Sequence, residues 1–382
     1  MDLELPFQIG PYDLVEELGV GGFATVYRGV LRGSMGFTRD FAVKLLAPEV
    51  AQASPEMVSL LADEARVLSR IRHRSVVSAQ WFGAIEHEDH GPIYVLVMEY
   101  VPGTTLHSLL ALDEHEHGVP ERPVVLEILL HLAEALDAAH SLLGSDDQPM
   151  GLVHRDVKPG NVMVTPQGEV VLLDFGIAKA RDRIADATRS DRIRGTIGYL
   201  APEQIEGTDI DFRADHFALG ALLYQMVTGE RILGDGPVLQ QLKQIATFDP
   251  TEYLARLRFE FPEIEGIASK LLARHPDDRY EATCLLVDDI RKVIDEVCDD
   301  EALPGWAARH VPPARAMARD FQALASAPSR APRRTEPATP SPADPPPEAP
   351  PEPEPLLDKG LPGPVLLAIG LAAGTAVGYV LG

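Results

Sequence analysis

The chain has 382 residues, a formal net charge of −24 and two cysteines, Cys284 and Cys298. That length suffices for one large or two smaller domains with a buried core. The negative charge excludes the basic surface that attracts nucleic-acid phosphates, so we expect no nucleic-acid partner. Two cysteines form no disulfide framework and fit a reducing compartment, and the N-terminus lacks the basic and apolar segments of a secretory signal.

The first part of the chain is rich in strand patterns. After a lead over residues 1–11, apolar and polar residues alternate as in strands in YDLVEEL, ATVYRGV and DFAVKLL. An amphipathic helical pattern follows in PEMVSLLADEARVLSRI, and two further strand patterns surround SAQWFGAI and IYVLVMEYV. Residues 12–98 are therefore predicted to form a small, sheet-rich lobe.

Two features of this lobe suggest nucleotide binding. Gly19 and Gly21 lie in a turn between strands, where backbone N–H groups can approach phosphates without side chains in the way. Lys44 lies in the middle of the apolar strand FAVKLL, where a buried amine needs an anionic partner. Glu64, in the helical ADEARVL, is a suitable partner, with phosphate as the second. A purely structural ion pair is the alternative; the glycine turn upstream favours a nucleotide clamp.

The following residues, 102–297, are predicted to be mainly helical, as in PVVLEILLHLAEALDAAHSLL and ADHFALGALLYQMVTG. Between these helices, GLVHRDVKPGNVMV concentrates polar groups. Asp156 could accept a hydroxyl proton, Lys158 could neutralise a transferring phosphoryl group, and Asn161 offers the hard oxygen that Mg²⁺ prefers. Asn161 and Asp174 bracket a predicted β-hairpin, VMVTPQGEVVLL, which would bring both to one place. These are the parts that phosphoryl transfer requires.

Seven motifs occur in a fixed order: GVGGFATV, AVK, DEARVL, HRDVKPGN, DFG, APE and HPDDR. As a set they resemble those of the eukaryotic-like (Hanks-type) serine/threonine protein kinases, most closely the bacterial ones, over roughly residues 12–297. The resemblance implies an α+β, bilobal protein kinase fold, with a small antiparallel β-sheet lobe at 12–98 and a larger helical lobe at 102–297. It also implies ATP and Mg²⁺ (or Mn²⁺) as cofactors and proteins as substrates, and the lysine at 158 is typical of the serine/threonine branch.

The resemblance implies a role for each matching residue. Lys44 would contact the α- and β-phosphates and pair with Glu64, Asp156 would be the catalytic base, and Lys158 would assist the γ-phosphate. Asn161 and Asp174 would hold Mg²⁺. Further ATP-binding positions are Leu18, Gly19, Gly21, Val26, Ala42, Met98, Glu99, Val101 and Met163. Structural roles are implied for Arg155, Thr196, Asp215 and the ion pair of Glu203 with Arg279.

In the family, the arginine that matches Arg155 binds a phosphate group on the activation segment. Here that segment is rich in arginine and offers Thr188 and Ser190 as acceptors, so we expect autophosphorylation at one of them. The alternative is that these arginines only solvate a mobile loop. Gly160 replaces an acidic residue that reads basic substrates in many relatives, so a preference for basic peptides is not implied.

Three functions are compatible with these motifs. The first is an active serine/threonine protein kinase. The second is a pseudokinase that acts as a nucleotide-binding signalling scaffold, which the intact set of catalytic residues disfavours. The third is a small-molecule phosphotransferase of related fold, against which the activation segment and the APE and HPDDR motifs argue.

The end of the chain changes character. Residues 298–326 are predicted to be a helical extension, and 327–360 a disordered, proline-rich linker, since repeated proline forbids helix and sheet. A ligand for a proline-binding module is the alternative for this linker. Residues 361–382 carry no charge and are long enough for a transmembrane helix; a helix docked on the globular domain is the alternative.

Glycines recur every fourth residue in this last segment, at Gly370, Gly374, Gly378 and Gly382. Such a face lets two membrane helices approach closely, so a homodimer is possible; the alternative is the ordinary glycine content of membrane helices. ATP chemistry keeps the kinase domain in the cytoplasm, and the basic residues before the span agree with that orientation. We therefore expect a single-pass protein of the cell membrane.

Overall fold

The structure is a computed structural model that describes residues 3–21, 23–88, 90–116, 119–144, 146–175, 197–207, 209–233, 236–297 and 301–312. The chain divides into two units, Met1–Ala327 and Pro328–Gly382, and every described residue belongs to the first. Several predictions lie outside the described residues: the linker at 327–360, the span at 361–382 with its glycines, and Thr188, Ser190, Thr196 and Cys298.

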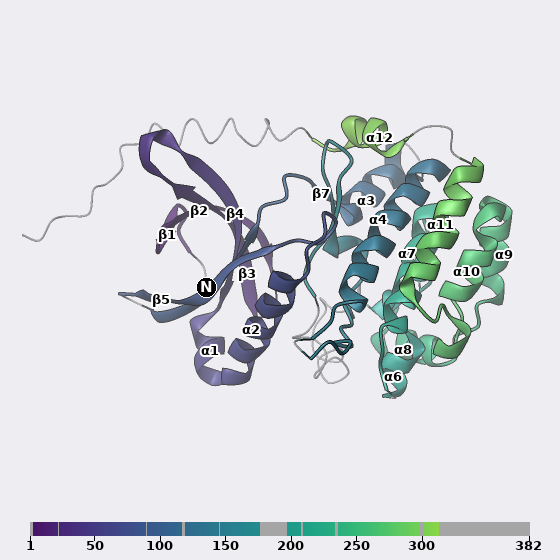
Figure 1. The fold of residues 1–382 in the computed structure, drawn as a ribbon, viewed down its shortest axis with the longest axis horizontal. Coiled ribbons are helices and arrows are strands. Elements are labelled where there is room, and N and C mark those ends of the chain that lie inside the picture. The colour runs from purple at the N-terminus through teal and green to yellow at the C-terminus, as the bar shows by residue number, and fades with distance from the viewer. Residues whose placement is uncertain are drawn as a thin grey trace, which may run out of the picture. The chain divides into compact units, whose positions relative to one another are not determined.

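The small lobe is an antiparallel sheet, as expected, and it has two helices where one was predicted (Figure 1). Its strand order is β1-β2-β3-β4-β6-β5, and each neighbouring pair is antiparallel. The strands are β1 (Phe7–Ile9), β2 (Tyr12–Val20), β3 (Ala24–Arg32), β4 (Thr38–Leu46), β5 (Ala79–His87) and β6 (Gly91–Glu99); the helices are α1 (Pro48–Ala53) and α2 (Pro55–Arg70). Strand β1 lies within the predicted lead and extends the sheet beyond β2.

The alternation along β4 positions the lysine predicted to bind phosphate. Val43 and Leu45 are buried in a small core of their own on one face of the sheet, with Ile93, Val95 and Val97 of β6. Because successive side chains on a strand point to opposite faces, Lys44 points to the other face, toward α2. On that side Leu96 and Met98 belong to the main core, which continues into the large lobe.

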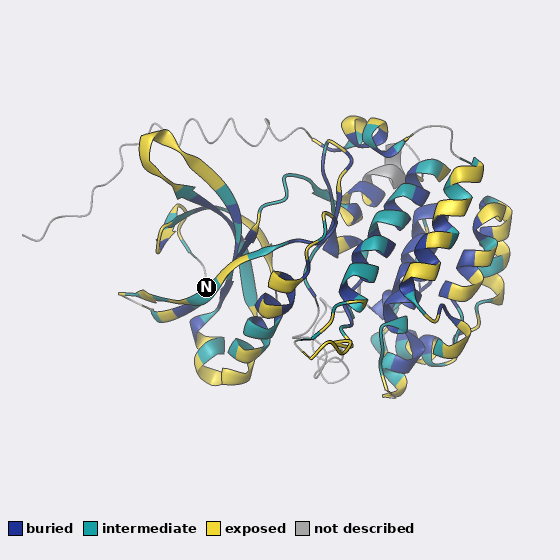
Figure 2. Cartoon of the chain, viewed as in Figure 1, coloured by how far each residue is buried: buried dark blue, intermediate teal, exposed yellow. Residues whose placement is uncertain are grey.

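The large lobe is helical, also as expected. Its helices are α3 (Leu106–Glu116), α4 (Arg122–His140), α6 (Pro202–Glu206), α7 (Arg213–Thr228), α8 (Val238–Ala246), α9 (Thr251–Glu260), α10 (Glu265–Leu271) and α11 (Thr283–Val297). Helix α7 is buried from Ala214 to Val227 and forms the centre of this lobe, whereas α9 and α11 present exposed outer faces (Figure 2). A small sheet, β7 (Thr104–Thr105), β8 (Val162–Val164) and β9 (Val170–Leu172), lies next to these helices.

Hydrogen bonds connect the turn that follows α2 in the small lobe to strand β9 of the large lobe. The Leu172 N–H donates to the Ser75 carbonyl at 2.8 Å, and the Val77 N–H donates to the Leu172 carbonyl at 3.1 Å. His73 stabilises this turn, because its Nδ1 atom accepts from the Ser75 N–H and its carbonyl accepts from the Val76 N–H. The position of the small lobe is thereby tied to the strand that leads into Asp174.

A further helix, α12 (Leu303–His310), follows the domain and packs against α4 (Figure 1). Trp306 and Leu303 are buried in the main core. Throughout the described ranges, no helix combines the length and apolar character needed to cross a bilayer.

Candidate active site

The predicted ion pair between Lys44 and Glu64 is formed. The Lys44 Nζ atom lies 2.8 and 3.1 Å from the two carboxylate oxygens of Glu64 on α2 and 3.2 Å from Oδ1 of Asp174. Burial alone would lower the pKa of Lys44, but the carboxylates of Asp174 and Glu64 raise it above its ordinary value, so the amine stays charged. One cation therefore connects the sheet, helix α2 and the segment after β9.

Asp156 is held in place by two neighbours in its own loop. The amide nitrogen of Asn161 donates to both Oδ2 and the backbone carbonyl of Asp156, each at 2.8 Å. The Lys158 Nζ atom lies 3.1 Å from Oδ2 of the same carboxylate. Asp156 is only 3% exposed, so its orientation is set by these contacts rather than by solvent. A carboxylate fixed in this way can accept a proton from a hydroxyl group placed beside it.

The hairpin that was predicted between Asn161 and Asp174 is present. Strands β8 and β9 pair with Val162 opposite Leu172, and the Leu173 N–H donates to the Asn161 carbonyl at 2.8 Å. Asn161 and Asp174 thus lie at the same end of the hairpin. Asp174 has a φ angle of 41°, in the left-handed region that residues other than glycine rarely adopt. This strained backbone turns the carboxylate toward Lys44.

The backbone of the loop before Asp156 is held by a buried carboxylate on α7. Asp215 accepts from the N–H groups of His154 and Arg155, each at 2.7 Å, and its Oδ2 atom lies 2.9 Å from Nε2 of His140. Burial alone would raise the pKa of Asp215, but the hydrogen bonds that it accepts from His140 and from the His154 N–H lower it below its ordinary value. Arg155, in this loop, has a φ angle of 66° and is a second residue of the site with a strained backbone.

The ring of His154 connects this loop to the segment after β9. Its Nε2 atom bonds to the Leu173 carbonyl at 2.9 Å, and its ring lies 4.5 Å from that of Phe175. The Asp156 N–H donates to His154 Nδ1 at 3.3 Å. Burial lowers the pKa of His154, so the ring stays neutral and can accept at Nδ1 while donating at Nε2.

The predicted ATP-binding residues lie on strands and a turn of the small lobe, on the connection after β6 and on β8. In the sheet Val26 is paired with Lys44 and Ala42 with Met98. Gly21 forms the tight turn between β2 and β3, and its N–H donates to the Ala24 carbonyl at 2.8 Å. The Glu99 N–H donates to the Ser78 carbonyl at 3.0 Å, so Glu99 has no backbone N–H to offer a base. Gly19 was predicted to lie in the turn with Gly21, but it is on β2, where it pairs with Val26. The remaining predicted positions are Leu18 on β2, Val101 after β6 and Met163 on β8.

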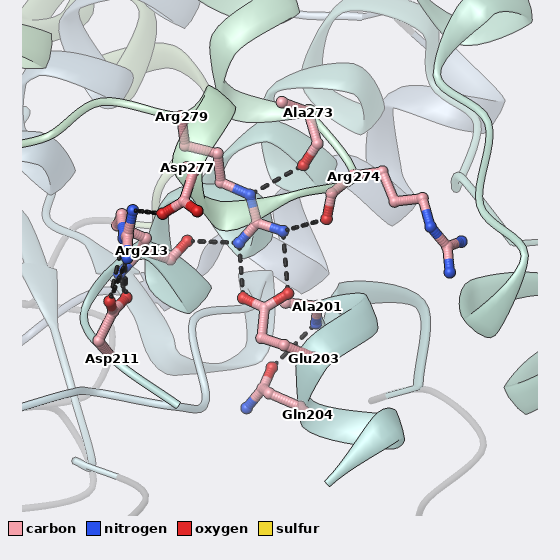
Figure 3. Close-up of polar contacts among 9 residues, drawn as sticks. All are labelled: Ala201, Glu203, Gln204, Asp211, Arg213, Ala273, Arg274, Asp277 and Arg279. Atoms are coloured by element: carbon pink, nitrogen blue, oxygen red, sulfur yellow. Dashed lines mark hydrogen bonds and ion pairs between the residues drawn. The ribbon is translucent and has the colours of Figure 1, made fainter. Parts of the chain in front are cut away.

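Glu203 and Arg279 form the predicted ion pair (Figure 3). Arg279 Nη1 and Nη2 donate to the two Glu203 oxygens at 2.6 and 2.9 Å. Its other three N–H groups donate to the carbonyls of Ala273, Arg274 and Arg213. Every donor of this fully buried guanidinium therefore has an acceptor, which ties the segment before α11 to α6 and α7.

Sequence reasoning missed two residues that the structure places next to this site. His140 contacts Asp215 from α4, and Thr283 contacts His140 from α11. Neither stands in a motif, and their partners are 75 and 143 positions away in the sequence. Only the folded chain brings them together.

Comparisons with known proteins agree with the motif order. The family described as "Protein kinase domain" matches residues 12–289. The chain is 36% identical over 291 residues to tyrosine-protein kinase MasK of Myxococcus xanthus (75% of this chain, 43% of the relative). It is 33% identical over 284 residues to serine/threonine-protein kinase PknB of Mycolicibacterium smegmatis (74% and 43%). It is also 33% identical over 308 residues to the probable serine/threonine-protein kinase SCO3848 of Streptomyces coelicolor (78% and 42%). The matches span less than half of each relative.

Proposed function

Because this chain belongs to the protein kinase family, in its bacterial Hanks-type serine/threonine branch, we propose that it transfers the γ-phosphate of ATP to serine and threonine residues of proteins. The observation that carries the proposal is the arrangement of two sets of polar side chains. Lys44 bridges Glu64 and Asp174, while Asp156 is held by Asn161 and Lys158. A pseudokinase would need none of these charged groups to be aligned.

The residues at the hairpin end fit Mg²⁺. Asn161 commits its amide nitrogen to Asp156, so its oxygen is the atom that it can offer to a cation. Asp174 supplies a hard carboxylate at the same end of the hairpin. When bound, Mg²⁺ neutralises charge on the β- and γ-phosphates. Asn161 and Asp174 would hold it, and the Lys44 amine would orient the α- and β-phosphates beside it.

The other groups act on the acceptor side of the reaction. Asp156 would orient the substrate hydroxyl and take its proton, a role that suits a carboxylate fixed at two points. Lys158 would move from Asp156 toward the γ-phosphate and neutralise charge there as the bond to the leaving oxygen lengthens. Most of the catalytic effect would then come from positioning and charge, as phosphoryl transfer requires.

The choice of acceptor is part of the proposal. Two of the three relatives above are named serine/threonine kinases and one is named a tyrosine kinase. Lys158, two residues after the base, favours serine and threonine, since it is the residue of the serine/threonine branch at this position.

The test is transfer of labelled phosphate from ATP by the full chain in detergent, alone and with a generic protein substrate, followed by analysis of the labelled amino acids. We expect phosphoserine and phosphothreonine, and their loss in Asp156→Asn, which keeps the shape of the side chain but removes the base. Nucleotide binding with no transfer in the wild type would instead support the scaffold function. Phosphotyrosine as the main product would overturn the acceptor assignment.

Autophosphorylation of Thr188 or Ser190 and anchoring through residues 361–382 are also part of the proposal. Arg155 supports autophosphorylation, because it directly precedes Asp156 in the sequence and its backbone N–H is held by Asp215. Mapping the phosphorylated residues in the same experiment tests it. Label at neither Thr188 nor Ser190 would contradict this part alone.

A further inference from the structure

The carboxylate that holds the catalytic loop is itself held by a chain of buried side chains. Beyond His140, Thr283 at the start of α11 places its Oγ1 atom 2.8 Å from His140 Nδ1. The same Oγ1 atom lies 2.9 Å from Nε2 of His216, which follows Asp215 on α7. Thr283 is 3% exposed and His216 is fully buried, so water does not compete for these groups.

The hydrogen bonds along this chain have one consistent direction. The ionised Asp215 carboxylate can only accept, so His140 donates from Nε2. A second hydrogen on the His140 ring would leave a buried hydrogen of Thr283 or His216 without an acceptor, so His140 Nδ1 is an acceptor. The Thr283 hydroxyl must then donate to His140 Nδ1, and its oxygen accepts from His216 Nε2–H. These tautomers follow from the network of partners.

One atom tests this direction. The Nδ1 atom of His216 has no hydrogen-bond partner within the part of the chain that the structure describes. In the order given above it carries no hydrogen. If the Thr283 hydroxyl pointed toward His216 instead, Nδ1 would carry a buried N–H without an acceptor, the rarer arrangement in proteins. Burial also lowers the pKa of His216 to about 3, which keeps the ring neutral.

Helix α11 is well placed to serve as the fixed end of this chain. Arg279, four residues before Thr283, donates to Glu203 and to the carbonyl of Arg213, two residues before Asp215 (Figure 3). Arg213 in turn pairs with Asp211 and Asp277. The start of α11 is therefore anchored to the first turn of α7 both through Arg279 and through Thr283.

We propose that Thr283 is a positioning residue for phosphoryl transfer. Its hydroxyl orients the His140 ring, His140 holds Asp215 against the N–H groups of His154 and Arg155, and the strained loop keeps Asp156 in place. The inference rests on the proposed kinase function. Thr283 touches neither nucleotide nor acceptor, so it acts on the turnover rate rather than on nucleotide binding.

The experiment compares Thr283→Val, which keeps the shape but removes the hydroxyl, with Thr283→Ser, which keeps the hydroxyl. The full chain is used, and kcat and the KM for ATP are measured. We expect Thr283→Val to lower kcat about tenfold, with the KM for ATP changed less than about twofold, and Thr283→Ser to restore most of kcat. Thr228→Val is the matched control, because the Thr228 hydroxyl bonds to the Tyr224 carbonyl within α7. A wild-type kcat in Thr283→Val would overturn the proposal.

A second variant separates positioning from stability. Thr283→Val leaves the His216 Nε2–H without an acceptor, which alone lowers stability. Adding His216→Leu removes that donor, so the double variant should regain stability while kcat stays low. Recovery of kcat together with stability would show that Thr283 only stabilises the fold, and would overturn the proposal.

Amide hydrogen exchange provides a readout that does not depend on catalysis. In Thr283→Val, exchange at His154 and Arg155 should become faster, while exchange in the core of α7 changes little. If the wild type transfers no phosphate, the proposed function fails, and this measurement still decides the inference. Faster exchange at these two amides supports the positioning role, and unchanged exchange overturns it.

Discussion

Arg279 is a charged residue in the interior of the large lobe, and Glu203 is its buried counter-ion (Figure 3). Glu203→Ala leaves the guanidinium buried without that counter-ion, so we expect the free energy of unfolding to fall by roughly 3–5 kcal/mol. Urea unfolding measures this change. The matched control is Asp277→Ala, which removes an exposed partner of Arg213 in the same network and should have little effect. Equal losses of stability in the two variants would contradict the conclusion that the buried pair of Glu203 and Arg279 stabilises the large lobe.

His216 makes the stability of the fold sensitive to acid. Burial lowers its pKa to about 3, against 6.5 as the ordinary value. Between these two values the unfolded chain binds one more proton at this residue than the folded chain. The free energy of unfolding therefore falls as pH is lowered from 6.5, by up to about 1.4 kcal/mol per pH unit from this group.

His216→Leu should remove that contribution. Urea unfolding at pH 7.5, 6.0 and 5.0 would then give a smaller loss of stability in the variant than in the wild type over the same range. Other histidines whose pKa is lowered by burial, His131 and His154 among them, remain in both proteins and contribute equally to both slopes. Parallel curves for the two proteins would show that His216 does not carry the acid sensitivity.

At the scale of elements, the N-terminus of α12 is capped by a carboxylate from another helix. Glu127 of α4 accepts from the N–H groups of Ala302 and Leu303, at 2.6 and 3.2 Å. The first N–H groups of a helix have no partner inside it, so this distant side chain does what a local capping residue usually does. Gly168, in the turn between β8 and β9, lies under the same helix: a Cβ atom there would be 2.9 Å from the backbone of Pro304. Helix α12 therefore packs on the hairpin that carries Asn161 and Asp174 at its other end.

Glu127→Ala should release the start of α12. We expect a stability loss of about 1 kcal/mol, the usual effect of removing a helix cap, together with faster amide exchange over residues 302–311. Glu127→Gln keeps an acceptor oxygen and should retain most of the protection. If exchange in α12 is as slow in Glu127→Ala as in the wild type, burial of Trp306 alone holds the helix.

Elements with a local pattern were predictable, and contacts between distant elements were not. The alternation in β4 predicted both a strand and a Lys44 that needs an anion, and the segment VMVTPQGEVVLL predicted the hairpin between Asn161 and Asp174. The cap by Glu127 joins residues 175 positions apart, and the bond of Thr283 to His140 joins residues 143 apart. No pattern within either segment marks them, because their partners are set by helix packing.

At the scale of the whole molecule, the catalytic unit and the C-terminal tail make separate predictions. All described residues belong to the unit Met1–Ala327, while the proposed anchor at 361–382 and its linker from Pro328 onward belong to the other. If the tail spans the membrane, the unit is confined near its surface, and the local concentration of neighbouring copies rises. Activation between copies would then depend on the tail although the catalytic residues lie elsewhere.

The glycine face of the proposed span tests this dependence. Leucine at both Gly374 and Gly378 would prevent close approach of two helices, so self-phosphorylation of the full chain in lipid vesicles should fall several-fold. The matched control places leucine at Ala372 and Ala376, two residues earlier and on the opposite face of a helix. Both variants should stay with the vesicles on flotation and phosphorylate an added protein substrate like the wild type. A wild-type chain that does not float would contradict the anchor, and equal self-phosphorylation in both variants would contradict pairing through the glycines.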